Sequence, residues 1–337
     1  MPKLLLIGPN YFNFNNSVKA AFENLGWSVH VEGYDTPIHP FKGMMKWRRK
    51  FSLNRNKLKQ KQDAKFNHSV TDVFKREKPD LVFVINGEIL FAETLNFFHA
   101  TSKVMLWMYD ALSRYPQSQK HIDHVDAFFC YEMEDVEFFG KQGKKACFLP
   151  QACDEKEYYP INTKKDIDIL FVGVLYRYNK RIKLLKAVVE QFSDKKLLIV
   201  GKYKPIEKNP IKWLFRERKD IYTNKNLSPN EVNRLYNHAK IVLNIHHETQ
   251  KYGANPKVFE ICASGAYQIC DYNPYIASVF PNGEVGLYKN EQELFDLIED
   301  ALKNDKSEQA LCAHNIVKTA HTFEERIKKV LRAIHFL

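Results

Sequence analysis

Two arginines stand four residues apart just beyond a strongly apolar run. The run 168–172 ends at Gly173, and Arg177 and Arg181 follow at equal spacing. Glycine lets the backbone approach a ligand closely, and a guanidinium fork can bond two phosphate oxygens at once. The pattern therefore predicts a diphosphate-binding loop, while a solvated basic helix start remains the alternative reading of the same residues.

A second pattern lies in the stretch NPKVFEICASGAYQICDY, which begins at Asn255. Asn255 followed by Pro256 is typical of a helix start, where backbone N–H groups and the helix dipole attract anions. Lys257 and Glu260 are three residues apart and share one face of that helix. A cation there suits a phosphate, and a carboxylate among apolar neighbours suits the two hydroxyls of a ribose. A weak surface Lys–Glu pair is the alternative.

Other polar residues follow the remaining apolar runs. Asp110 comes after the run 104–108, where its carboxylate could act as the general base that deprotonates an acceptor hydroxyl. A structural aspartate that caps the next helix fits this position equally well. Lys202, Asn226 and His246 also lie at run ends, and we expect them to contact the nucleobase and the diphosphate. His246 and its neighbour His247 point opposite ways on a strand and lack a third ligand, so no metal is expected.

A scaffold with strand ends gathered at one edge is needed to bring these residues together. Apolar runs alternate with helical patterns, which implies parallel sheets covered on both faces. The expected strands are 4–7, 28–31, 81–85, 104–108, 127–130, 146–149, 168–172, 197–200, 221–222, 241–245 and 267–271. The expected helices are 17–25, 64–76, 135–141, 180–191, 229–238, 257–263 and 291–302.

A chain of 337 residues exceeds the usual size of one hydrophobic core. We predict an α/β protein of two Rossmann-like domains that face each other across a cleft, at 1–160 and 161–320. In 321–337, apolar residues at helical spacing predict a terminal helix. That helix either crosses back over the cleft or packs on its own domain.

The net charge of +11 is concentrated between Lys42 and Lys65, where Asp63 is the only acid. Such a field favours an anionic partner: a phosphate-bearing acceptor, a membrane surface, or a nucleic acid such as DNA. A mobile basic helix that only aids solubility is the alternative. The first apolar run is too short for a signal peptide, and the six cysteines show no zinc spacing. A cytoplasmic protein, with or without peripheral attachment to the membrane, is expected.

The stretch at Asn255 resembles the C-terminal motif of the glycosyltransferase group 1 family, especially its CgeB-like branch. The resemblance implies that Glu260 binds the ribose and that Lys257 faces the diphosphate. The spacing of Gly173, Arg177 and Arg181 is similar to the phosphate loop of phage DNA β-glucosyltransferases, GT-B enzymes that use UDP-glucose. Lysine stands at 257 where relatives carry arginine, and Tyr252 stands where many retaining relatives carry a first glutamate.

The resemblance implies a GT-B glycosyltransferase that uses a nucleotide-diphosphate sugar, with UDP favoured and no cofactor or metal required. It also implies that the domain 1–160 binds the acceptor and that the domain 161–320 binds the nucleotide sugar. Inverting relatives place an aspartate at the position of Asp110, which implies an inverting mechanism with this residue as the base. The expected product is a cell-surface glycan or a lipid-linked saccharide. A DNA-modifying glucosyltransferase and a non-catalytic nucleotide- or nucleic-acid-binding protein are the rival interpretations.

Overall fold

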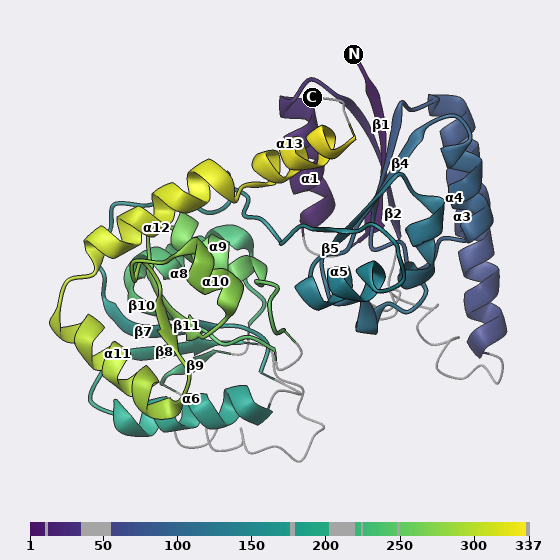
Figure 1. Ribbon diagram of the computed structural model, residues 1–337. Helices are drawn as coiled ribbons and strands as arrows, with labels where there is room; N and C mark the ends of the chain where they lie inside the picture. The colour runs from purple at the N-terminus through teal and green to yellow at the C-terminus, as the bar shows by residue number, and fades with distance from the viewer. Residues whose placement is uncertain are drawn as a thin grey trace. The chain divides into compact units, whose positions relative to one another are not determined.

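The computed structural model describes residues 1–10, 13–34, 55–175, 179–201, 220–223, 225–247 and 250–334. The chain divides into two compact units, and each has its own sheet and helices (Figure 1). Unit 1 comprises Met1–Pro150 together with Phe323–Leu337, and unit 2 comprises Gln151–Thr322. The chain therefore first passes from unit 1 to unit 2 after Pro150. The sequence suggested a boundary ten residues later, near residue 160.

Unit 1 is built on a parallel sheet of six strands in the order β2-β1-β3-β4-β5-β6. Its strands are β1 (Lys3–Pro9), β2 (Ser28–Tyr34), β3 (Leu81–Ile85), β4 (Lys103–Trp107), β5 (Ala127–Cys130) and β6 (Cys147–Phe148). Its helices are α1 (Phe14–Asn24), α3 (Arg55–Glu77), α4 (Ala92–His99), α5 (Met133–Gly140) and α13 (Phe323–Ala333), with 3-10 turns η1 (Leu112–Arg114) and η2 (Ser118–His124).

Helices cover both faces of this sheet because successive strand side chains point to opposite sides. Leu5 and Ile7 of β1 pack with Val70 and Phe74 of α3 in one core. On the other face, α1 and α13 lie together (Figure 1), and the rings of Phe14 in α1 and Phe323 in α13 are 5.0 Å apart. The terminal helix thus completes the fold of unit 1.

The terminal helix is fixed by a polar bond as well as by its apolar stripe. The side chain of Arg326 is buried, and its Nε donates a hydrogen bond of 3.1 Å to the backbone oxygen of Pro150. Ile327, Val330 and Leu331 fill the apolar stripe that the sequence predicted. A buried guanidinium with a carbonyl partner avoids the large cost of an unpaired buried charge.

Unit 2 repeats the architecture with a parallel sheet in the order β12-β11-β10-β7-β8-β9. Its strands are β7 (Ile167–Val172), β8 (Leu197–Val200), β9 (Tyr222–Thr223), β10 (Ala239–Asn244), β11 (Tyr267–Asp271) and β12 (Gly286–Tyr288). Its helices are α6 (Asn179–Gln191), α8 (Pro229–His238), α9 (Pro256–Ala263), α10 (Pro274–Val279), α11 (Glu291–Lys303) and α12 (Ser307–Ala320).

The polar stretch before β7 belongs to unit 2 because α8 binds its backbone. The N–H of Tyr159 donates to the Asn233 side chain at 3.2 Å, and that of Ile161 donates to the Asn237 side chain at 2.6 Å. Asn237 returns a bond to the Tyr159 carbonyl at 3.1 Å. These buried amides satisfy main-chain groups of the polar stretch.

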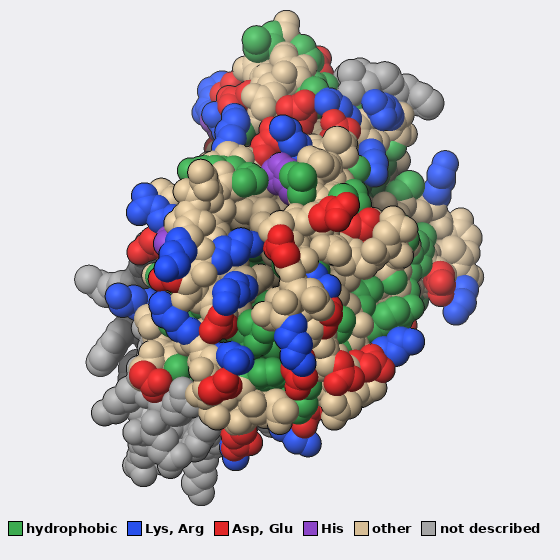
Figure 2. All heavy atoms as spheres, turned by 90° about the vertical axis from the view of Figure 1, so that its left-hand side faces the viewer, with side chains coloured by type: hydrophobic (Ala, Val, Ile, Leu, Met, Phe, Trp, Pro, Cys, Tyr) green, Lys and Arg blue, Asp and Glu red, His purple; other side chains and the backbone are tan. Residues whose placement is uncertain are grey.

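Charges of both signs are intermixed on the face drawn in Figure 2. The described end of the basic segment lies in the first turns of α3, where Lys57, Lys61 and Lys65 are exposed. Residues 42–54 lie outside the described part of the chain. None of the described helices is both long enough and apolar enough to span a bilayer.

The loop after β3 has an unusual backbone that several side chains hold in place. Asn86 and Gly87 have positive φ values of 60° and 71°. The Tyr34 hydroxyl donates to the Ile85 carbonyl at 2.8 Å and accepts from the Gly87 N–H at 3.1 Å. The buried His121 of η2 bonds the Gly87 carbonyl through Nε2 at 3.0 Å. This histidine therefore ties η2 to the loop.

Replacing His121 with Gln should reduce the loss of stability on mild acidification. Burial lowers the pKa of His121 to about 4 from an ordinary value near 6.5. Between these values the unfolded chain binds the extra proton, so stability falls as the pH falls. Between pH 7 and pH 5 this residue should lower the free energy of unfolding of unit 1 by about 2 kcal/mol. The variant should not show this loss.

Urea unfolding at the two pH values, read by hydrogen exchange on unit 1 peptides, measures this difference. The exposed His68→Gln provides the matched control and should keep the full pH dependence of the unmodified protein. Equal pH dependence in His121→Gln and the unmodified protein would contradict the assignment.

Candidate functional site

Several of the predicted donor residues of unit 2 lie near the point where the strand order of its sheet reverses. From β7 the chain proceeds outward through β8 and β9, and then returns to place β10 on the other side of β7. In open parallel sheets, ligands bind beyond the carboxyl ends of strands at such a switch point. The segments after β7 and β10 contain Gly173 and His246, two of the predicted residues.

Two glycines, Gly173 and Gly201, follow neighbouring strands at this edge of the sheet. A Cβ added to Gly201, after β8, would lie 2.0 Å from the carbonyl oxygen of Gly173, and one added to Gly173 would lie 2.8 Å from the Phe171 ring. The N–H of Gly173 donates to the Val200 carbonyl at 2.8 Å. Close packing against backbone therefore requires glycine at 201, whereas a side chain at 173 would require the Phe171 ring to move.

Arg181 lies in the first turn of α6 and bridges the two sides of the switch point. Its Nη1 donates to the Val174 carbonyl at 2.6 Å, and its Nη2 donates to the Ile245 carbonyl beyond β10. Its guanidinium carbon lies 5.7 Å from the centre of the Phe171 ring. These contacts fix a permanent positive charge at the carboxyl ends of β7 and β10.

Lys257 and Glu260 lie in α9, both partly buried, and their charges interact. Burial lowers the pKa of Lys257, and Arg181 lowers it further, while Glu260 opposes both effects. Burial raises the pKa of Glu260, against the opposing effects of Lys257 and of a hydrogen bond from the Tyr158 hydroxyl. The charges of Arg181 and Glu260 thus both act on Lys257, which places the three residues in one electrostatic cluster.

A buried chain of side-chain amides holds the start of α9 against two strands. Asn255 and Asn244 of β10 bond each other through their amides at 3.1 and 3.3 Å. Asn244 also donates to Gln268 of β11 at 2.9 Å, and Gln268 donates to the Val258 carbonyl in α9 at 3.0 Å. Asn255 occupies the N-cap position as predicted, but its side chain bonds the strand and makes no capping bond.

His246 is paired with a carboxylate that the sequence analysis did not select. Its Nδ1 lies 2.9 Å from Oδ1 of Asp271, the last residue of β11, and its backbone N–H bonds the same oxygen at 2.8 Å. Burial disfavours ionisation of Asp271, but the bonds and charge of His246 outweigh it and lower the Asp271 pKa. The ring is thereby held in a fixed orientation at the sheet edge.

The remaining predicted residues are not gathered by these contacts. Arg177 and Lys202 fall outside the described residues. Asn226 is exposed in the segment between β9 and α8. Asp110 belongs to unit 1, where Ala111 donates its N–H to Oδ1 at 2.9 Å and Arg114 forms an ion pair with the carboxylate. Burial raises the pKa of Asp110, and Arg114 opposes that effect.

Two tyrosines near Glu260 were also missed by sequence reasoning. Tyr158 precedes β7, and Tyr236 lies in α8 with its ring centre 6.2 Å from that of Tyr158. Burial, and then the charge of Glu260, raise the pKa of both hydroxyls. Neither residue lies in a strand-end loop, so no local pattern marked them. Within the described residues, no three His, Cys, Asp or Glu side chains are grouped as metal ligands.

We expect Gln268→Leu to destabilise unit 2 by about 2–3 kcal/mol, because the Asn244 amide and the Val258 carbonyl would lose buried partners. The change in the free energy of unfolding is measured from the urea transition in which unit 2 unfolds. The control Gln191→Leu alters an exposed residue at the end of α6 and should stay within about 0.5 kcal/mol. Equal effects of the two substitutions would show that the amide chain contributes little.

A family model matches the part of the chain that contains these residues. The family model described as glycosyl transferase-like matches residues 180–332, the part of the chain that contains Arg181, Lys257 and Glu260. No curated protein sequence matches the chain.

Solved structures share the whole fold at low sequence identity. Sucrose-phosphate synthase from Thermosynechococcus elongatus matches with a TM-score of 0.68 and 12% identity over 99% of both chains. HepE from Anabaena, in complex with UDP-glucose, matches with a TM-score of 0.65 and 12% identity over 100% of both. The trehalose-phosphate synthase from Burkholderia xenovorans matches at 0.69 and 10% over 99% of both. The predicted α/β fold with two Rossmann-like halves is confirmed as that of GT-B glycosyltransferases, and residues 180–332 match the glycosyl transferase-like family model.

Proposed function

We propose that the protein is a glycosyltransferase that moves a sugar from a UDP-sugar to an acceptor hydroxyl. The observation that carries this proposal is the cluster of Arg181, Lys257 and Glu260 at the switch point of unit 2. Two cations and a carboxylate with tyrosine neighbours suit a diphosphate joined to a ribose. One solved structure of the same fold contains UDP-glucose, which favours uridine as the nucleoside.

In the proposed mechanism, Arg181 and Lys257 bind the diphosphate and Glu260 accepts hydrogen bonds from the ribose hydroxyls. Arg177, Lys202, Asn226 and His246 complete the donor contacts, together with the backbone of Gly173. The bond between the anomeric carbon and the phosphate oxygen breaks while the acceptor oxygen bonds that carbon. Cationic side chains and the start of α9 stabilise the charge on the departing UDP, so no metal ion is required.

We further propose that Asp110 takes the acceptor proton in an inverting reaction. The raised pKa of this carboxyl favours proton acceptance near neutral pH. Its partner Arg114 would then stabilise the carboxylate before each reaction cycle. The inverting outcome and the role of Asp110 stand or fall together, because a retaining enzyme needs no base at this position.

The proposed acceptor is a glycan for the cell surface or on a lipid carrier, at the cytoplasmic face of the membrane. Exposed Lys57, Lys61 and Lys65 of α3 support contact with an anionic surface. DNA is the alternative source of such an anion, and a DNA-modifying glucosyltransferase is the alternative function. Vesicle co-sedimentation and DNA gel shifts over a range of salt concentrations distinguish the two.

Glu260→Gln should weaken UDP-glucose binding about tenfold or more, because a charged acceptor of ribose hydroxyls becomes neutral. Isothermal titration with UDP-glucose measures affinity, and thermal melting without ligand checks the fold. The control Glu190→Gln changes an exposed carboxylate of α6 and should bind like the unmodified protein. The donor assignment is wrong if Glu260→Gln binds UDP-glucose with unchanged affinity.

Asp110→Asn should abolish sugar transfer while UDP-glucose still binds with its normal affinity. An amide keeps the shape of the side chain but cannot take a proton from the acceptor. Transfer is measured as UDP release that depends on added acceptor. Transfer at the normal rate would remove Asp110 from the mechanism and leave its bonds to Ala111 and Arg114 as a structural role.

A further inference from the structure

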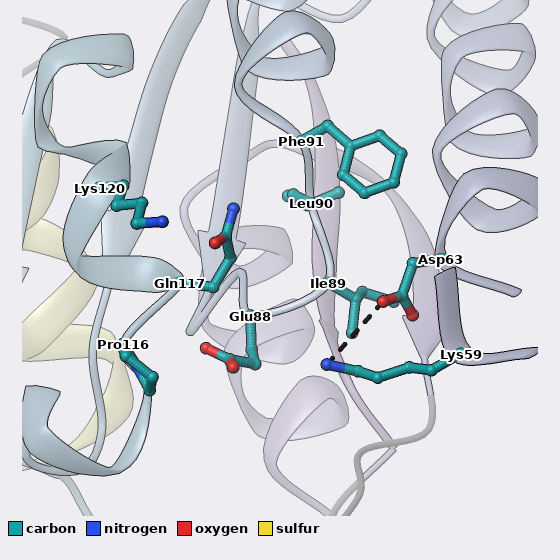
Figure 3. Close-up of a pocket in the computed structure, with 9 residues that line it drawn as sticks. All are labelled: Lys59, Asp63, Glu88, Ile89, Leu90, Phe91, Pro116, Gln117 and Lys120. Carbon is teal, nitrogen blue, oxygen red and sulfur yellow. Dashed lines mark ion pairs between the residues drawn. The ribbon is translucent and has the colours of Figure 1, made fainter. Parts of the chain in front are cut away.

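Unit 1 contains a hollow of about 400 Å³ whose lining the donor site does not use. It opens between the segment after β3, the 116–120 segment and the first turns of α3 (Figure 3). The residues that matter for its chemistry are Lys59, Asp63, Glu88, Phe91, Gln117 and Lys120. A volume of this size is typical of small-molecule sites.

The walls of the hollow are held in place before any ligand arrives. Asn67 of α3 is buried, donates to the Ile89 carbonyl at 2.8 Å and accepts from the Phe91 N–H at 2.9 Å. On the opposite wall, the Ser118 hydroxyl bonds Glu88 at 3.3 Å, and His121 bonds Gly87. Preorganised walls reduce the entropy lost on binding.

The lining combines hydrogen-bonding groups of both kinds with an aromatic ring. Lys59 and Lys120 extend from opposite sides, and Glu88 and Gln117 lie between them (Figure 3). A carboxylate accepts hydrogen bonds, an ammonium donates them, and an amide does both. Phe91 adds an apolar face whose ring carries negative charge density, which suits the C–H groups of a sugar.

The charge balance argues against an anionic ligand. Two lysines and two acids line the hollow, and the Lys59 ammonium lies 3.9 Å from Asp63. Burial raises the pKa of Glu88, whereas Lys59 and bonds from Ser118 and Gln117 lower it. A phosphate beside this partly desolvated carboxylate would add repulsion between like charges. Uncharged hydroxyl groups meet no such penalty.

The hollow also has an electrostatic connection to the proposed base. Burial, followed by the charge of Asp110 and more weakly that of Glu88, raises the pKa of the Tyr115 hydroxyl to about 12. Both carboxylates therefore lie within electrostatic range of one buried tyrosine in unit 1. Tyr115 thus interacts both with the proposed base and with the carboxylate that lines the hollow.

We propose that this hollow binds an uncharged saccharide unit of the acceptor, with Glu88 and Gln117 bonding its hydroxyls and Phe91 packing on its ring. The proposal rests on the proposed glycosyltransferase function, and it narrows the acceptor from anionic groups in general to a neutral sugar at this position. Glu88 serves here in binding and orientation, and the proton transfer stays with Asp110.

Saturation-transfer NMR on the full chain tests the proposal with methyl α-glucoside, methyl β-galactoside, N-acetylglucosamine and cellobiose as neutral probes. Glucose 6-phosphate and inorganic phosphate are the anionic probes. We expect at least one neutral probe to bind, and Glu88→Gln and Gln117→Ala each to weaken it about tenfold. The controls Glu137→Gln and Gln142→Ala change exposed residues of unit 1 and should bind as the unmodified protein does.

Titration of UDP-glucose into the same samples separates the two proposals. If UDP-glucose binds but no neutral probe does, the hollow is not a saccharide site and the donor assignment survives. If the neutral probes bind but UDP-glucose does not, the hollow is a saccharide site and the proposed donor is rejected. Binding of phosphate probes alone, or neutral binding unchanged in both Glu88→Gln and Gln117→Ala, overturns the inference. Thermal melting of every variant confirms that each is folded.

Discussion

The buried amide chain from Asn255 through Asn244 to Gln268 is the constraint on which the rest of unit 2 depends. Each amide both donates and accepts, so the start of α9 can take only the position that satisfies β10 and β11 together. Lys257 and Glu260 follow from that position, because they lie within the next turns. An apolar core alone would hold α9 on the sheet but would fix its position and orientation there less precisely.

Hydrophobic periodicity predicted most of the elements because continuous apolar runs are typical of buried parallel strands. It placed α8 at its observed bounds, where Ser228 and Glu231 form a capping box. It missed α4, α10, α12 and β12, which are short or weakly amphipathic. It began α3 at residue 64, although the helix starts at Arg55. A basic first turn opposes the helix dipole, so local signals there disfavour a helix.

The candidate site was predictable only where chemistry and strand ends coincided. Arg181, Lys257 and Glu260 each carry a charge beside a recognisable loop or helix start, and the sheet places these ends together. Tyr158 and Asp271 contribute through partners distant in sequence, which no spacing reveals. Asp271 was assigned to a strand, and its role became visible only when β10 and β11 paired. Long-range pairing is information that a single sequence does not state.

The chain crosses between the units twice, and this has a consequence for synthesis on the ribosome. Unit 2 is one continuous segment, Gln151–Thr322, and can complete its core as soon as it emerges. Unit 1 begins before unit 2 but lacks α13 until unit 2 has been made. Until then the ring of Phe14 and the carbonyl of Pro150 lack their later partners, Phe323 and Arg326. Unit 1 therefore starts before unit 2 but is completed after it, which leaves its α1 face open to chaperones while unit 2 is made.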